Sequence, residues 1–345
     1  MITVLQPGLL STIQDEGRQD YLAYGLPRAG VMDRYASRMA NLLCGNPLSA
    51  AVIEMTMMGG SFRFEKPCRI AICGGEMAPR LNNAMIEQWK AFDIKSGDVL
   101  VLGYAQSGCR SYLAVSGGIE VPVVLGSRST YTRANVGGIE GRALRADDRI
   151  ALGEMPPVQV QPINLDTTFI PTYPERISLR VLLGPQDDLF LPEGIEAFVS
   201  TEYLVTDEAD RMGYRLEGPP IRHAGKADIV SDALGRGAVQ VPGNEQPIVM
   251  MADCGTTGGY AKIATVIGAD LWRLAQAKPS DMIKFILCSE NEAVQALVEE
   301  REKYRRVAKQ VAGGLAETAL LKPASRSMRV TIQNQSYQIE IEEVK

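Results

Sequence analysis

The stretch SFRFEKPCRIAIC, residues 61–73, holds two short runs on either side of Pro67 in which apolar residues recur at every second position. A period of two is typical of a β-strand with one buried face. Runs of a similar kind lie at residues 2–6 (ITVLQ), 99–103 (VLVLG) and 110–115 (RSYLAV). The first part of the chain is therefore predicted to form β-sheet from short strands joined by turns.

The second half of the chain has the same character. Strands are predicted at residues 177–184 (ISLRVLLG), 237–242 (GAVQVP) and 246–251 (QPIVMM). Two pairs of segments echo one another across the chain, SGDVLVL (96–102) with SDMIKFIL (280–287), and VLQPG (4–8) with VLLGP (181–185). These echoes indicate a duplicated β unit, so the predicted class is mainly β with a few helices.

Two helices interrupt the predicted strands. The first is expected to begin after Asp33, an N-cap residue, and to run through RYASRMANLLC to a stop at Gly45. The second begins near Ser289, because Ser289 and Glu292 have the spacing of a capping box.

Composition divides the chain into five parts. Residues 1–155 are assigned to the first β unit, and the proline-rich residues 156–176 to a linker or crossing segment. Residues 177–312 hold the second unit with its C-terminal helix. Residues 313–327 are expected to be a flexible linker, and residues 328–345 alternate as a β-hairpin tail.

The bulk composition excludes several classes of protein. The chain has 345 residues, a net charge of -5 and no long basic run, which argues against nucleic acid as a partner. No apolar run reaches the roughly 18 residues of a membrane span, and MITVLQPGLL lacks the basic start of a signal peptide. The six cysteines form no CxxC pair, as expected of reduced thiols in a cytoplasmic protein.

A single histidine, His223, limits the possible chemistry. It cannot supply an HExxH motif or a His/Cys cluster, so no metal site is expected. A Ser-His-Asp triad would have to use His223, which lies far from any G-x-S-x-G elbow; an exposed loop position is the favoured interpretation. The chain also contains no G-x-x-x-x-G-K-[ST] phosphate loop.

Four stretches gather more polar, charged and glycine residues than a core requires. They are residues 11–33, 110–130, 211–218 and 239–266. Glycines such as Gly17 and Gly25 can serve the turn alone, or their backbone N–H groups can face a ligand. The number of such turns near arginines favours a binding site, although no single turn does.

The same stretches resemble a known family. The resemblance rests on IQDEGRQDYLAYGLPRAGVMD, ANLLCGNP, GCRSYLAVSGGIEVPVVLGSRST, RMGYRLEG and GAVQVPGNEQPIVMMADCGTTGGYAKIATVIGADL, which follow one another in order over roughly residues 1–300. These motifs are similar to the C subunit of bacterial 5-oxoprolinase, in the KipA-like group also called allophanate hydrolase subunit 2. The same module occurs in the carboxyltransferase region of urea carboxylase.

This resemblance implies a fold, partners and a reaction. The fold is two cyclophilin-like β-barrel domains, and the partners are a KipI-like B subunit and a LamB/YcsF-like A subunit. The reaction is ATP-dependent opening of the 5-oxoproline lactam to glutamate, in which phosphorylation of the lactam precedes ring opening. Because the chain has no phosphate loop, ATP, with or without Mg²⁺, is expected to bind in the assembled complex.

Such chemistry needs cationic clamps and oriented N–H groups more than a nucleophile. The predicted catalytic residues are Asp15, Arg18, Arg28, Asp33, Arg211 and Tyr214. The arginines are expected to bind phosphate or carboxylate, the carboxylates to orient substrate, transfer protons or contact a metal, and the tyrosine to close the pocket. Asp33 has the alternative role of a simple helix cap.

A second group of residues offers neutral hydrogen bonds suited to an amide substrate. The predicted substrate-binding residues are Ser116, Gly117, Gly118, Gln240, Asn244, Gln246, Thr256, Thr257 and Gly258. Replacing Arg211 or Thr257 with alanine is expected to abolish ATP-coupled turnover of the complex without unfolding the chain.

Two alternative functions stay open at this point. One is a biotin-dependent carboxyltransferase component acting on urea or a related amide, and the other is a regulatory antagonist of a KipI-type kinase inhibitor. The tail MRVTIQNQSYQIEIEEV is similar to the first strands of biotin or lipoyl carrier domains. No Ala-Met-Lys-Met follows it, so no covalent biotin is expected on this chain.

Overall fold

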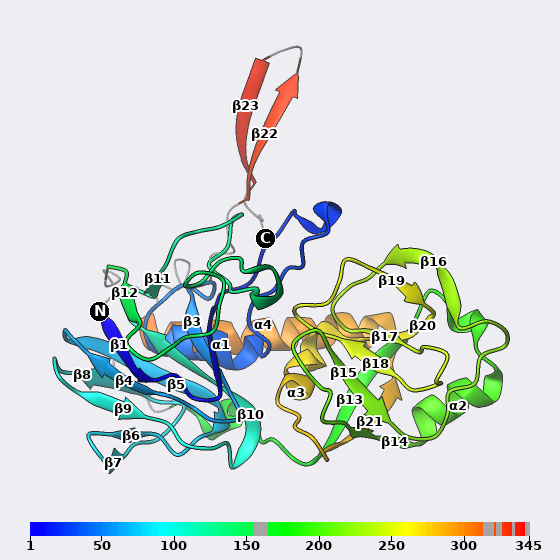
Figure 1. Cartoon of the computed structure of the whole chain (residues 1–345), viewed down its shortest axis with the longest axis horizontal. Helices are drawn as coiled ribbons and strands as arrows, with labels where there is room; N and C mark the ends of the chain where they lie inside the picture. Colours follow the sequence, from blue (N-terminus) through cyan, green and yellow to red (C-terminus); the bar gives the residue numbers. More distant parts are fainter. Residues whose placement is uncertain (155–164, 313–320, 322–325, 333–334, 342–345) are drawn as a thin grey trace.

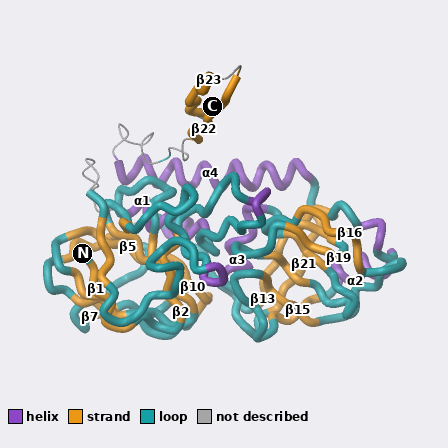
Figure 2. Tube along the Cα trace, turned by 45° about the horizontal axis from the view of Figure 1, so that its top comes forward, coloured by secondary structure: helices purple, strands orange, loops and turns teal. Residues whose placement is uncertain are grey.

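The computed structural model describes residues 1–154, 165–312, 321, 326–332 and 335–341. Two β-rich lobes lie side by side, and the long helix α4 (Glu290–Ala312) runs along both of them (Figures 1 and 2). The mainly β class predicted from the sequence is confirmed. None of the described helices is both long enough and apolar enough to cross a lipid bilayer.

The first lobe consists of two sheets packed face to face. One has the strand order β11-β12-β1-β4-β9-β6-β7 and the other β2-β3-β10-β5-β8. The strands are β1 (Ile2–Gln6), β2 (Leu10–Gln14), β3 (Val52–Thr56), β4 (Ser61–Phe64), β5 (Cys68–Glu76), β6 (Arg80–Leu81), β7 (Ala84–Met85), β8 (Ala91–Ile94), β9 (Val99–Val101), β10 (Ser107–Val115), β11 (Ile119–Glu120) and β12 (Arg149–Leu152).

Alternation along β5 explains how this lobe forms two hydrophobic layers. Ile70 and Ile72 point into the core between the two sheets. Ala71 and Cys73, on the opposite face, pack under helix α1 (Arg34–Leu43). A strand buried on both faces accounts for the nearly continuous apolar run in this stretch.

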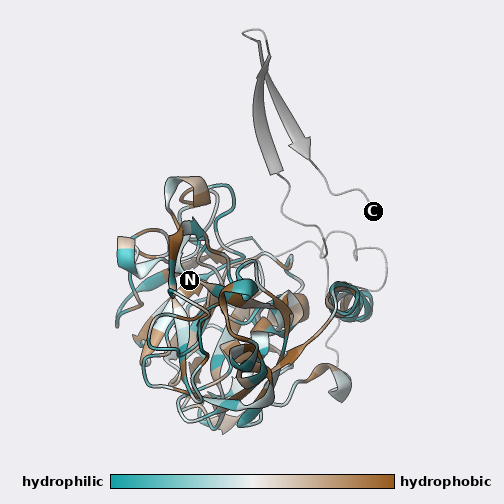
Figure 3. Ribbon diagram, turned by 90° about the vertical axis from the view of Figure 1, so that its right-hand side faces the viewer, coloured by the Kyte–Doolittle hydropathy of each residue, from teal (hydrophilic) through white to brown (hydrophobic). Residues whose placement is uncertain are grey.

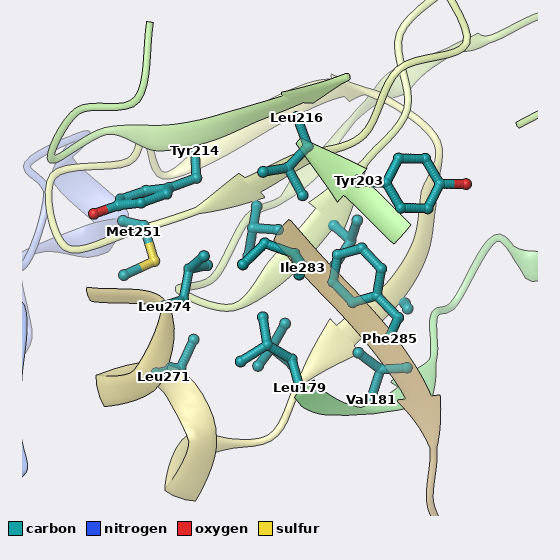
Figure 4. Close-up of a cluster of buried hydrophobic side chains, with 14 of the residues drawn as sticks. Leu179, Val181, Tyr203, Tyr214, Leu216, Met251, Leu271, Leu274, Ile283 and Phe285 are labelled. Carbon is teal, nitrogen blue, oxygen red and sulfur yellow. The ribbon is translucent and has the colours of Figure 1, made fainter. Parts of the chain in front are cut away.

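The second lobe is a closed seven-stranded barrel, in the order β13-β20-β17-β18-β15-β14-β21. Its strands are β13 (Arg176–Leu183), β14 (Glu202–Val205), β15 (Gly213–Glu217), β17 (Ala238–Gln240), β18 (Ile248–Met250), β20 (Lys262–Val266) and β21 (Met282–Leu287). Large side chains such as Leu179, Tyr203 and Phe285 fill the interior (Figure 4). A small separate sheet pairs β16 (Asp228–Ala233) with β19 (Thr257–Tyr260) beside the barrel.

The remaining elements are short. Helices α2 (Pro192–Ser200) and α3 (Leu271–Ala275) belong to the barrel lobe. The 3-10 turns within the described residues are η1 (Leu22–Tyr24), η2 (Thr132–Ala134), η3 (Thr167–Phe169), η4 (Asp187–Leu189) and η5 (Gly268–Asp270). Strands β22 (Arg326–Ile332) and β23 (Gln335–Ile341) pair antiparallel as the predicted hairpin, whose turn falls outside the described residues.

Both predicted helix starts are confirmed. The Asp33 carboxylate accepts a hydrogen bond from the Ala36 N–H at 2.9 Å, which caps α1. At α4, the Ser289 N–H donates to the Glu292 carboxylate at 2.7 Å, and the Glu292 N–H donates back to the Ser289 hydroxyl. This is the reciprocal pair of a capping box.

Helix α4 holds the two lobes together from outside. Ala296 packs against Ile267 of the barrel lobe, whereas Tyr304 and Val307 join the hydrophobic layer over α1 in the first lobe. Seen end-on in Figure 3, α4 is composed mostly of hydrophilic residues, although the apolar Val294, Leu297 and Val298 are exposed on it. The predicted linkers at residues 156–176 and 313–327 fall partly outside the described residues.

Met32 links the lobes from inside. It belongs to the segment that leads into α1, yet its fully buried side chain is part of the barrel core. The first lobe therefore contributes a side chain to the hydrophobic core of the second.

Candidate functional site

The segment that carries Met32 is held by two arginines of the barrel lobe. Arg211 Nη2 donates to the Gly30 carbonyl at 2.7 Å. Arg236 donates to the next two carbonyls, with Nη1 to Val31 at 3.1 Å and Nη2 to Met32. Three successive carbonyl groups of the first lobe are thus bound by cations placed just before β15 and β17, and we call this contact the interlobe clamp.

Arg211 also joins two buried carboxylates. Its Nε and Nη2 donate to the two Asp253 oxygens, each at 2.9 Å, and Nη1 donates to Glu54 of β3. Burial acts to lower the pKa of Arg211, but the Asp253 and Glu54 charges outweigh it and raise that pKa. Every nitrogen of this guanidinium group is engaged, so the predicted anion clamp at Arg211 is already filled by the protein.

Glu54 was not predicted as a functional residue. It is buried in a β3 stretch that is otherwise apolar, and its second oxygen accepts a hydrogen bond from the Met32 N–H at 2.7 Å. A lone charge inside an apolar strand was the available signal, since a buried carboxylate requires a partner.

A buried chain of hydrogen bonds connects Asp33 with Tyr214. Asp33 accepts a hydrogen bond from Gln276 Nε2 at 2.7 Å, and Gln276 Oε1 accepts from the Arg110 N–H at 2.9 Å. Arg110 Nη1 donates to the Tyr214 hydroxyl at 2.6 Å, and that hydroxyl donates to the Ala277 carbonyl. The Tyr214 ring lies at the edge of the barrel core with its hydroxyl directed toward the first lobe (Figure 4).

Burial alters the acidity of both groups. It raises the pKa of Asp33 to about 7, although hydrogen bonds from Gln276 and Ala36 oppose the change. It also raises the pKa of Tyr214 to about 12. Asp33 therefore caps α1 and also titrates near neutral pH, so the two roles predicted for this residue are compatible.

Asp15 organises the loop that follows β11. Its carboxylate accepts hydrogen bonds from the Gly17 N–H at 2.9 Å, the Ser127 hydroxyl at 2.6 Å, the Arg128 N–H at 2.6 Å and the Ser129 hydroxyl. Four donors on one carboxylate fix residues 127–129 against the end of β2. The role this geometry gives Asp15 is positioning, while proton transfer or metal contact stays a prediction.

At the junction between the two lobes, the Arg18 side chain has hydrogen-bond donors that no acceptor among the described residues uses. The residue is 1% exposed, and its Nη2 donates to the Ser129 carbonyl at 2.5 Å. Its Nε and Nη1 have no acceptor within the described part of the chain. Burial lowers the pKa of Arg18, whereas Asp15 and Asp253 act to raise it. Each buried N–H group without a partner costs about 1–3 kcal/mol, which makes Arg18 a candidate for binding an acceptor from outside the chain.

Arg28 is attached to Arg18 through the backbone. The Arg18 N–H donates to the Arg28 carbonyl at 2.7 Å. Of the predicted catalytic residues, Arg211 contacts the segment from Asp15 to Asp33 directly, and Tyr214 is connected to Asp33 through Arg110 and Gln276. A catalytic role for any of the six residues stays a prediction.

The Ser116–Gly118 turn lies elsewhere, between β10 and β11. The Ser116 hydroxyl accepts from the Arg69 N–H at 3.0 Å, and the Gly117 N–H donates to Asn46 Oδ1 at 2.9 Å. The Gly118 N–H donates to the Val115 carbonyl at 2.8 Å. Since the turn uses these groups internally, its geometry is that of a structural turn.

Gln240 and the glycine turn lie on the side of the barrel. Gln240 Nε2 donates to the Tyr260 carbonyl at 3.2 Å, and Gly258 packs directly on this amide. Thr257 and Gly258 belong to β19, where the Thr257 side chain is exposed, and Thr256 accepts a backbone hydrogen bond from Leu234. These residues form a group separate from the interlobe clamp.

Asn244 and Gln246 lie in the turn after β17. The Gln246 side chain exchanges two hydrogen bonds with the backbone of Gly218, at 2.8 and 3.2 Å. Asn244 Oδ1 accepts from the Gln246 N–H at 3.3 Å. In a nearby loop, His223 Nε2 lies 3.0 Å from the Val241 carbonyl. The predicted substrate-binding residues are thus distributed over three places, and their binding role stays a prediction.

In the described part of the chain, this junction holds neither a cluster of metal ligands nor either of two cavities found elsewhere in the molecule. Among the described residues, no three His, Cys, Asp or Glu side chains are placed to hold a metal ion. Cavities of about 370 and 180 Å³ lie beside the segment 168–174, and Trp272 and Arg273 line both of them. These cavities are lined by neither Arg18 nor the interlobe clamp residues.

Comparison with known proteins identifies the family to which this chain belongs. The model of the family described as "Carboxyltransferase domain, subdomain A and B" matches residues 24–287, so the chain belongs to that family. The relationship predicted from the sequence motifs is confirmed.

Individual relatives give a finer view. The chain is 36% identical to the C subunit of 5-oxoprolinase from Escherichia coli over 309 residues, covering 89% of this chain and 98% of that protein. It is 34% identical to the corresponding 5-oxoprolinase C subunit of Haemophilus influenzae, covering 86% of this chain and 94% of that protein. It is also 37% identical to the urea amidolyase of Saccharomyces cerevisiae over 302 residues, which are 83% of this chain but only 16% of that protein.

Solved structures of related proteins superimpose on this chain. The Kluyveromyces lactis urea carboxylase superimposes with a TM-score of 0.85 at 29% identity, covering 99% of this chain and 32% of that one. The protein TTHA0988 gives a TM-score of 0.75 at 34% identity, covering 83% of this chain and 56% of that one. The chain therefore spans about a third to a half of the length of these structures.

The geometry of the interlobe clamp predicts that Arg211→Ala destabilises the chain, whereas the sequence alone predicts a loss of turnover without unfolding. Arg211→Ala leaves Glu54 and Asp253 buried without their cation, which should lower the free energy of unfolding by about 3–5 kcal/mol. Thr257→Ala, at an exposed position, should stay within about 0.5 kcal/mol of the parent. Urea unfolding of both variants measures the difference, and equal stability would refute the structural role of Arg211.

The raised pKa of Asp33 predicts a pH dependence. Between the ordinary value near 4 and about 7, the folded chain holds a proton on Asp33 that the unfolded chain has lost. The contribution of Asp33 to stability is therefore present below about pH 4 and is lost as the pH rises through about 7. Urea unfolding at pH 5 and pH 8 should show this loss, and Asp33→Asn should reduce it. If the free energy of unfolding of Asp33→Asn fell between pH 5 and pH 8 by as much as that of the parent, Asp33 would not be the group responsible.

Proposed function

We propose that this chain is a subunit of an ATP-dependent 5-oxoprolinase, which opens 5-oxo-L-proline to L-glutamate. The observation that carries the proposal is the extent of the similarity, since the match covers 98% of a protein named as the C subunit of a 5-oxoprolinase. The matches to urea amidolyases cover only 16–17% of those proteins.

The chemistry of the junction supports this proposal. A lactam is stabilised by resonance, so its carbonyl must be activated before water can attack. Transfer of the γ-phosphoryl group of ATP to the carbonyl oxygen creates a leaving group, and water then opens the ring to give glutamate, ADP and phosphate. Charge stabilisation and positioning dominate such catalysis, and Arg18 is a buried cation with open N–H groups.

The full reaction requires partners in this proposal. The sequence contains no phosphate loop, so we assign ATP, with its Mg²⁺, to a site that a KipI-like B subunit helps to form. Ring opening is finished on a LamB/YcsF-like A subunit. The chain alone is accordingly expected to be inactive, and we place the assembled complex in the cytoplasm.

A specific observation favours a second candidate, a biotin-dependent carboxyltransferase component. The family model describes a carboxyltransferase domain, and the fold superimposes on a urea carboxylase with a TM-score of 0.85. In that case the junction would hold the carboxyl group during transfer to urea or a related amide. The biotin would come from another protein or domain, since this chain has no Ala-Met-Lys-Met motif.

Reconstitution tests the two candidates directly. The chain is mixed with purified LamB/YcsF-like A and KipI-like B proteins, and glutamate release from 5-oxo-L-proline is measured with and without ATP. The proposal predicts release that requires ATP and all three proteins. Carboxylation that depends on a biotin carrier, in place of glutamate release, would contradict the proposal and support the second candidate.

A further inference from the structure

Arg18 differs from the other buried arginines at the junction in how many of its donors are unused. Both Nε and Nη1 lack an acceptor within the described residues, which leaves three of its five N–H bonds open. Arg211 uses all three nitrogens, and Arg236 leaves only Nε open. On a cation that is 1% exposed, unused N–H donors cost free energy, because they have lost water without gaining an acceptor.

Asp15, the carboxylate whose charge acts most strongly on Arg18, already accepts hydrogen bonds from other donors. Asp15 accepts from two backbone N–H groups and two serine hydroxyls, which fix residues 127–129. The Ser129 carbonyl then takes Arg18 Nη2, and Gly137 lies so close that a Cβ atom there would be 2.3 Å from the same nitrogen. One edge of the Arg18 guanidinium is thus held by the protein, while its remaining N–H groups are left for another acceptor.

We propose that Arg18 binds the carboxylate group of the small-molecule substrate. The chemical class, a monoanionic carboxylate, follows from the unused donors and the neighbouring charges at Arg18. Its assignment to the carboxylate of 5-oxo-L-proline rests on the proposed function.

The charge of the surroundings favours a carboxylate over a phosphoryl group. The planar guanidinium fork can bind two oxygens of either group, so the fork alone does not decide between them. The charges of Asp15 and Asp253 act on Arg18, and a monoanion is repelled by these acidic neighbours less than a phosphate dianion is. Binding of the carboxylate would leave the lactam ring free for activation at its carbonyl.

Calorimetric titration of the full chain tests this assignment. The probes are 5-oxo-L-proline, pyrrolidin-2-one, which is the same lactam without the carboxylate, and inorganic phosphate. The parent should bind 5-oxo-L-proline at least about tenfold more tightly than pyrrolidin-2-one, and R18Q should remove that preference. R149Q, which makes the same charge change at an exposed ion pair with Glu65, should retain it.

A conservative variant guards against misfolding. R18K keeps the charge but not the planar fork, so it should weaken 5-oxo-L-proline binding severalfold while unfolding at the parent temperature. Absence of a preference for 5-oxo-L-proline in the parent, or its retention in R18Q, would overturn the proposal. Loss of phosphate binding alone in R18Q would also overturn it, because the site would then belong to a phosphoryl group.

These binding measurements are independent of turnover. If the reconstituted complex releases no glutamate but Arg18 still determines carboxylate binding, the proposed function fails and the carboxylate site stands. If glutamate is released and R18Q binds 5-oxo-L-proline like the parent, the reverse holds.

Discussion

Two arginines of the barrel lobe bind three successive carbonyl groups of the first lobe, and the position of the candidate site depends on this contact. Arg211 and Arg236 hold the backbone of Gly30, Val31 and Met32. Hydrogen bonds from cations are stronger than those between neutral groups, and this contact is largely buried. The segment therefore has one defined path, with the Met32 side chain in the barrel core.

Several other features follow from the path of that segment. Asp33, one residue later, caps α1 and reaches Gln276 of the barrel lobe. Asp15 and Arg18, at the start of the same loop, are brought against residues 127–129 and near Asp253. Charged residues that lie more than two hundred positions apart in the sequence are thus brought together at the junction. The proposed carboxylate site at Arg18 uses this convergence, because Asp15 holds Ser129, and the Ser129 carbonyl in turn accepts from Arg18.

The sequence predicts what is local in this structure. Alternation identifies the strands, Asp33 and Gly45 bound α1, and the Ser289–Glu292 spacing marks the start of α4. Each of these features depends on neighbours only a few residues away. The mainly β class follows from them.

The arrangement of the site was less predictable, because its partners are distant in sequence. Arg211 pairs with Glu54 across 157 positions, and no local pattern encodes that choice. The glycine turns illustrate the same limit: Ser116–Gly118 and Thr256–Gly258 look equally suited to a ligand, yet internal hydrogen bonds occupy the first and β19 incorporates most of the second. Sequence identifies flexible turns but does not show which N–H groups stay free.

The interlobe clamp, together with helix α4 and Met32, makes the two lobes one cooperative unit. Differential scanning calorimetry of the full chain tests it most directly, by comparing the measured enthalpy of unfolding with the van't Hoff enthalpy. A single transition in which the two enthalpies agree is the predicted result. Two resolved transitions, one for each lobe, would contradict it.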